Sequence, residues 1–129
     1  MAGSDKDRRE FVRVPFRTEV TVRTPERTLW ANSTLDISLN GLRIATEGRP
    51  PAEGTACEIE IVLSNADPPV IIDAGGTVVR PEPGMLAIRL TELDFDSYDH
   101  LRQLILNNAA DPEKAEQEFD AHWGIRKPS

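Results

Sequence analysis

The amino acids at positions 57–63 are Cys-Glu-Ile-Glu-Ile-Val-Leu. The odd-numbered positions are apolar, and two of the three even-numbered positions carry glutamate. Successive side chains of a β-strand point to opposite faces, so this alternation predicts a strand with one face in a core and the other in water. Cys57 belongs to the apolar set, and we expect it to fill the core.

Five further strand-like segments lie on both sides of this one. They are short, and turn-forming residues separate them, for example in the Pro81-Glu82-Pro83-Gly84 segment. The Gly75-Gly76 pair predicts a bulge or bend inside its strand. Together the six strands favour a mainly β fold, a small antiparallel barrel or sandwich. The five additional predicted strands are residues 18–24, 29–37, 41–46, 70–80 and 85–90.

The apolar spacing changes to that of a helix after the last strand. Asp96 or Ser97 can cap this first helix, because aspartate and serine accept hydrogen bonds from free N–H groups. A second helix is predicted to begin at Asp111-Pro112-Glu113, with Asp111 as its N-cap and Pro112 in its first position. The predicted buried face of the first helix is Tyr98, Leu101, Leu104 and Ile105.

These patterns divide the chain into three parts. Residues 1–17 are predicted to be a flexible N-terminal arm, in which Pro15 suits the entry to a strand. Residues 18–108 form the barrel and the first helix. Residues 109–129 are predicted to be a C-terminal extension whose helix ends near Gly124. Phe119 and Trp123 are expected to hold this helix against the barrel or a partner.

Composition indicates one globular domain. The chain has 129 residues, of which 39% are hydrophobic and 29% charged. Its single cysteine excludes an internal disulfide and a cysteine-based zinc site. No apolar run approaches the ~20 residues of a membrane helix, and the charged N-terminus lacks the apolar stretch of a secretory signal. We therefore expect a cytoplasmic protein without membrane insertion.

Charge is distributed unevenly along the chain. The formal net charge is −7, which argues against binding to nucleic acid polymers. Residues 1–17 carry five Lys/Arg and three Asp/Glu, a sum of +2, so the remaining residues sum to −9. A small basic arm on an acidic body fits a compact anionic ligand.

Two short motifs carry the functional prediction. The first is Arg9-x-x-x-Arg13 in the arm, directly preceded by Arg8. The second is Asp36-Ile37-Ser38-Leu39-Asn40-Gly41, between two predicted strands. In this order they resemble the RxxxR and D/N-x-S-x-x-G motifs of PilZ domains, whose fold is a six-stranded antiparallel barrel. The family often has glycine where this chain has Asn40, a residue that also tolerates positive φ.

The resemblance implies binding of cyclic di-GMP, a bacterial second messenger with two phosphates and two guanines. Guanidinium groups of Arg8, Arg9 and Arg13 match phosphate oxygens and the O6/N7 acceptors of guanine. Asp36 can accept from a guanine Watson–Crick edge. Ser38 can bond the ligand or fix the turn, and Gly41 allows both close backbone approach and a φ that other residues disfavour.

Other polar residues receive weaker interpretations. Arg43, Arg80 and Arg89 could line the ligand side of the barrel, although a surface role is favoured, and Trp30 is assigned to the core. The spacing of Asp94, Asp96 and Asp99 lacks the glycine and glutamate of a calcium loop. His100 and His122 are assigned surface or packing roles. Neither a metal site, a cofactor, nor catalytic machinery is predicted, so an enzyme is disfavoured.

The predicted function is to bind cyclic di-GMP and relay the signal to a downstream protein. The N-terminal arm is expected to fold over a ligand seated on the barrel. Because the ligand would bind this closed arm better than the open one, it would drive closure and so change the surface presented to the downstream protein. The alternative is a protein-interaction adaptor on the same fold that does not bind nucleotide.

Overall fold

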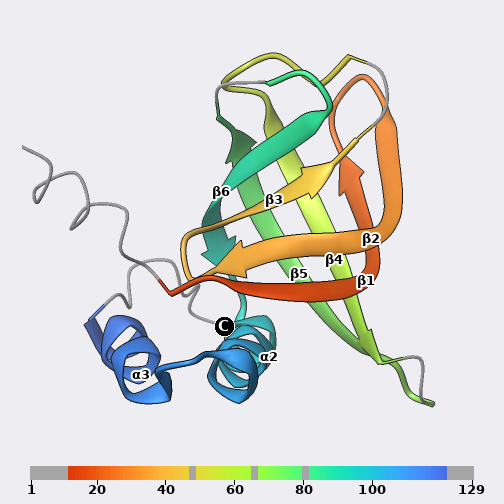
Figure 1. The fold of residues 1–129 in the computed structure, drawn as a ribbon. Coiled ribbons are helices and arrows are strands. Elements are labelled where there is room, and N and C mark those ends of the chain that lie inside the picture. Colours follow the sequence, from red (N-terminus) through yellow and green to blue (C-terminus); the bar gives the residue numbers. More distant parts are fainter. Residues whose placement is uncertain (1–11, 47–48, 65–66, 80–81, 122–129) are drawn as a thin grey trace, which may run out of the picture.

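The computed structural model describes residues 12–46, 49–64, 67–79 and 82–121, and shows a closed barrel of six antiparallel strands with two helices at one end (Figure 1). This confirms the predicted mainly β fold, a six-stranded antiparallel barrel with C-terminal helices. The strand order around the barrel is β1-β2-β3-β6-β5-β4. The elements are β1 (Val14–Arg23), β2 (Thr28–Ser38), β3 (Gly41–Ala45), β4 (Ala56–Ser64), β5 (Val70–Val78), β6 (Met85–Leu93), α2 (Phe95–Asn108) and α3 (Pro112–Ala121).

Alternating side chains of all six strands fill the barrel. On β4, Cys57, Ile59 and Ile61 are buried, while Glu58 faces outward. The alternation of residues 57–63 therefore sets the inner face as predicted. Burial also raises the pKa of the Cys57 thiol to about 11, because desolvation disfavours the thiolate. Cys57 is thus a packing residue rather than a nucleophile.

The assignment of Trp30 to the core is wrong. Its side chain is 63% exposed. Leu29 and Ala31, its neighbours on β2, pack against the core, so the period of the strand turns Trp30 outward.

The barrel begins earlier than predicted, because β1 starts at Val14 and not at residue 18. Val14 is buried in the core, so residues 14–17 belong to the barrel and not to the arm. Pro15 fits there because β1 pairs with β4 only over Val20–Arg23, which leaves that edge of the strand without a ladder at Pro15.

The Gly75-Gly76 pair marks the predicted bulge, since the register between β5 and β6 shifts between these two residues. A Cβ atom on Gly76 would lie 2.6 Å from the Arg89 carbonyl oxygen, so the two strands approach too closely there for any side chain.

The helix α2 begins earlier than predicted. Its N-cap is Asp94, whose side chain accepts a hydrogen bond from the Ser97 N–H at 2.8 Å, and not Asp96 or Ser97. Ser97 is buried instead, and its hydroxyl accepts a hydrogen bond from the Asp73 N–H. The predicted apolar face is confirmed, because Tyr98, Leu101, Leu104 and Ile105 are all buried.

The second helix, α3, begins as predicted, with Asp111 accepting from the Lys114 N–H at 3.2 Å. It packs on α2 through Phe119, which is buried against Tyr98 with ring centroids 5.4 Å apart. The Tyr98 hydroxyl donates to the Phe119 carbonyl oxygen at 2.9 Å. Trp123 and Gly124 lie outside the described residues.

Candidate functional site

The first two strands bring Arg13 and Asp36 together, although 23 positions separate them in the sequence. In the β1–β2 ladder Pro15 pairs with Asp36, which places Arg13 beside the end of β2. The Arg13 Nη1 and Asp36 Oδ2 atoms are 3.8 Å apart, and each side chain is 45% exposed. Such an exposed pair stabilises a protein by only about 0–1 kcal/mol. A ligand could therefore engage both side chains at little cost.

Ser38 fixes the turn between β2 and β3. Its side chain is buried, and its hydroxyl donates to Asn40 Oδ1 at 2.9 Å, with the Gly41 carbonyl oxygen at 3.3 Å. The Asn40 carbonyl oxygen accepts from the Leu90 N–H at 2.9 Å, which ties the turn to β6. Of the two predicted roles of Ser38, these contacts favour the structural one.

Close packing explains Gly41, not an unusual backbone angle. Positive φ occurs in the described residues only at Gly54 and Gly84, so neither Asn40 nor Gly41 uses the conformation that their residue types permit. Instead, a Cβ atom on Gly41 would lie 2.7 Å from the Ile88 carbonyl oxygen on β6. The structure thus shows a close backbone approach of Gly41 to β6, while its approach to a ligand stays a prediction.

The backbone next to Arg13 contacts the C-terminal helix. The Val12 N–H donates to Glu118 Oε1 on α3 at 2.8 Å. Figure 1 shows the start of β1 at the end of the barrel where α2 and α3 lie. The position of Arg13 thus depends in part on α3.

Three of the predicted arginines, Arg8, Arg9 and Arg80, lie outside the described residues. The other two barrel arginines are on the outer face beside the motif. Arg43 pairs with Asp36 in the β2–β3 ladder, and Arg89 pairs with Gly41 in the β3–β6 ladder. From the sequence, a place on the ligand side was only the weaker interpretation for both, since the ladders that position them are long-range.

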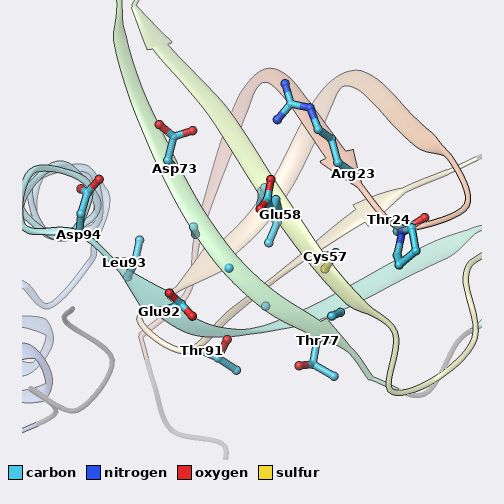
Figure 2. A pocket seen from close by; sticks show the side chains of 16 residues that line it. Arg23, Thr24, Cys57, Glu58, Asp73, Thr77, Thr91, Glu92, Leu93 and Asp94 are labelled. Atoms are coloured by element: carbon cyan, nitrogen blue, oxygen red, sulfur yellow. The ribbon is translucent and has the colours of Figure 1, made fainter.

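A groove of about 740 Å³ lies elsewhere, on the wall that β4, β5 and β6 form. Figure 2 shows the carboxylates of Glu58, Asp73, Glu92 and Asp94 around it, with Arg23 at one side. Arg23 also lies 3.9 Å from Glu60. None of the motif residues that the structure describes lines this groove. Its negative charge disfavours an anionic nucleotide, whereas the face around Arg13 carries cations.

The described residues form neither a metal site nor a membrane-spanning helix. No cluster of three or more His, Cys, Asp or Glu side chains there could hold a metal ion. The described helices include none with the length and apolar character required to cross a bilayer.

The fold and the turn define a class, a small closed barrel whose β2–β3 turn carries an Asp-x-Ser-x-x-Gly motif beside an arginine. The sequence model of the PilZ domain matches residues 7–107. The chain belongs to the PilZ domain family, as the resemblance predicted. Among curated proteins no sequence matches the chain.

Two solved structures share the fold. The inhibitor of motility MotI/DgrA of Bacillus subtilis is 17% identical with a TM-score of 0.59, over 76% of this chain and 49% of MotI. The PilZ domain of CeSA from a cellulose-synthesizing bacterium is 16% identical with a TM-score of 0.54, over 74% of this chain and 95% of that one. The chain thus spans about half the length of MotI.

Proposed function

We propose that this chain is a cytoplasmic receptor for cyclic di-GMP that passes the signal to a downstream protein and catalyses no reaction. Domains of its family are generally receptors or adaptors for this messenger. The observation that carries the proposal is the pairing of Arg13 with Asp36 beside the turn of residues 38–41.

The chemistry of this pair suits the ligand. A guanidinium can bind a phosphate, or the O6/N7 edge of guanine, with two parallel hydrogen bonds. A carboxylate accepts the N–H donors of the Watson–Crick edge of guanine. Arg13 and Asp36 are both accessible, so a ligand seated beside the turn could use both groups.

Replacing Arg13 with alanine should weaken cyclic di-GMP binding about ten-fold or more, because a hydrogen bond to a charged group contributes about 1.5–3 kcal/mol. Asp36→Ala should have an effect of similar size. Isothermal titration calorimetry measures both, with Arg23→Ala as the matched control, since Arg23 lies at the opposite end of β1. Wild-type affinity in a folded Arg13→Ala protein would remove this pair from the site.

Arg8 and Arg9 complete the proposed set with Arg13, Asp36, Ser38 and Gly41, and Arg8 is assigned to a second ligand. The resemblance implies that an arginine directly before RxxxR accommodates two stacked cyclic di-GMP molecules. Two ligands bring four phosphates together, and a further guanidinium would offset part of their repulsion. Titration should therefore show two ligands per chain, and Arg8→Ala should weaken the second more than the first. A one-to-one titration at high ligand concentration would contradict this stoichiometry.

The second candidate function is a protein-interaction adaptor that does not bind the nucleotide. The exposed Trp30 on β2 favours it, since tryptophan is enriched at the centres of protein interfaces. The same titration discriminates the two functions, because an adaptor would give no heat with cyclic di-GMP.

A further inference from the structure

The strand β6 places an arginine beside the turn motif. Arg89 is exposed, while Ile88 and Leu90 on either side of it are buried, so its side chain lies on the outer face. Its direct partner on β3 is Gly41. Because Gly41 has no side chain, no side chain of β3 lies directly opposite Arg89.

The backbone around Arg89 is fixed relative to the motif. The N–H of the next residue, Leu90, donates to the Asn40 carbonyl oxygen at 2.9 Å. The Ile88 carbonyl oxygen on the other side is the atom that a Cβ on Gly41 would meet. The hydrogen bond ties the turn to this part of β6, and the close approach at Gly41 leaves no room for a side chain between the two strands.

The Arg89 side chain has no polar partner within the part of the chain that the structure describes. Arg43, its diagonal neighbour across the β3–β6 ladder, differs in this respect. The Arg43 Nη2 atom lies 3.3 Å from Glu82 Oε1, so a carboxylate already offsets its charge. Of the two barrel arginines near Gly41, Arg89 is therefore the one whose charge is available to an anion.

We propose that Arg89 contacts the ligand, binding a phosphate or a guanine of cyclic di-GMP that lies over Gly41. This inference rests on the proposed function and adds a barrel residue to its site. The strand holds the backbone of Arg89 in place, so its contact requires no ordering of backbone, which costs about 1–2 kcal/mol per residue. Arg89 would thus hold the ligand from the barrel, on the side of the turn away from Arg13.

The test is calorimetric titration of the full chain with cyclic di-GMP. Arg89→Ala should bind about ten-fold more weakly than wild type, since a charge-assisted contact is lost. Arg89→Lys should fall between the two, because lysine keeps the charge but loses the planar fork. Arg23→Ala, which removes one exposed charge beside the acidic groove, should bind as wild type does.

Two further readouts separate a ligand contact from a structural role. The thermal midpoint of Arg89→Ala should match that of wild type, and its affinity should depend less steeply on salt. Equal affinity in Arg89→Ala and Arg23→Ala, with wild type binding, would overturn this inference and leave the receptor function standing. Absence of binding by wild type would overturn both.

Discussion

Replacing Phe119 with alanine should detach α3 from α2 while the barrel stays folded. Phe119 is only 2% exposed, and its ring meets that of Tyr98 edge to face, at 84°. Truncation of a buried phenylalanine to alanine costs about 3–5 kcal/mol. A ten-residue helix such as α3 has little stability of its own, because isolated helices shorter than about 12–15 residues are marginal in water. Because α3 can detach on its own, the loss of stability should be confined to this helix.

Amide hydrogen exchange measures this outcome element by element. In Phe119→Ala the amides of α3 should lose protection, while those of β4 and β5 keep it. Tyr98→Phe is the matched control, since it keeps the ring and removes the hydroxyl that donates to the Phe119 carbonyl oxygen, a change of about 1 kcal/mol. Equal loss of protection in the barrel would show instead that α3 and the barrel unfold as one unit.

The strands could be predicted because their signal is local. Alternation within residues 57–63 states which side chains face inward without knowledge of any partner strand. The same period in β2 turns Trp30 outward, but the general preference of tryptophan for cores outweighed it in the prediction. The start of β1 was missed because Pro15 was interpreted as the entry to a strand that begins at residue 18, whereas a free edge allows the strand to include it.

The N-cap of α2 could not be predicted from residue type alone. Asp94 and Asp96 are both chemically able to cap it. Which of them caps the helix depends on where β6 ends. The strand β6 ends at Leu93, which is buried, so the helix follows directly and Asp94 is its N-cap. A capping residue can be recognised by type, but its position follows from the preceding element.

The candidate site combines a local and a long-range signal. The two motifs could be recognised in the sequence alone. The proximity of Arg13 to Asp36 depends on the β1–β2 register. A short turn sets that register, with Thr24 N–H donating to the Arg27 carbonyl oxygen at 2.8 Å. Residue pairing from this turn then places Pro15 opposite Asp36, next to Arg13. The position of Arg89 beside Gly41 could not be predicted, because it requires the pairing of β3 with β6.

Replacing Gly41 with alanine should both destabilise the barrel and weaken the binding of cyclic di-GMP. The added Cβ would lie 2.7 Å from the Ile88 carbonyl oxygen, a backbone atom that cannot rotate away. The strands β3 and β6 must then separate, and an added methyl group in a packed site costs about 1–3 kcal/mol. The same separation strains the hydrogen bond between the Leu90 N–H and the Asn40 carbonyl oxygen, and so moves the turn.

Gly54→Ala is the control that separates stability from site geometry. Gly54 has a φ of +87° and no atom within 4 Å of an added Cβ, so alanine there costs about 1–2 kcal/mol from backbone strain alone. Both variants should unfold at lower temperature than wild type. Only Gly41→Ala should lose affinity, by about ten-fold or more, because ligand contacts tolerate displacements of only about 0.5 Å. Wild-type affinity in Gly41→Ala would mean that the ligand does not lie against this turn, and equal losses in both variants would mean that binding follows stability.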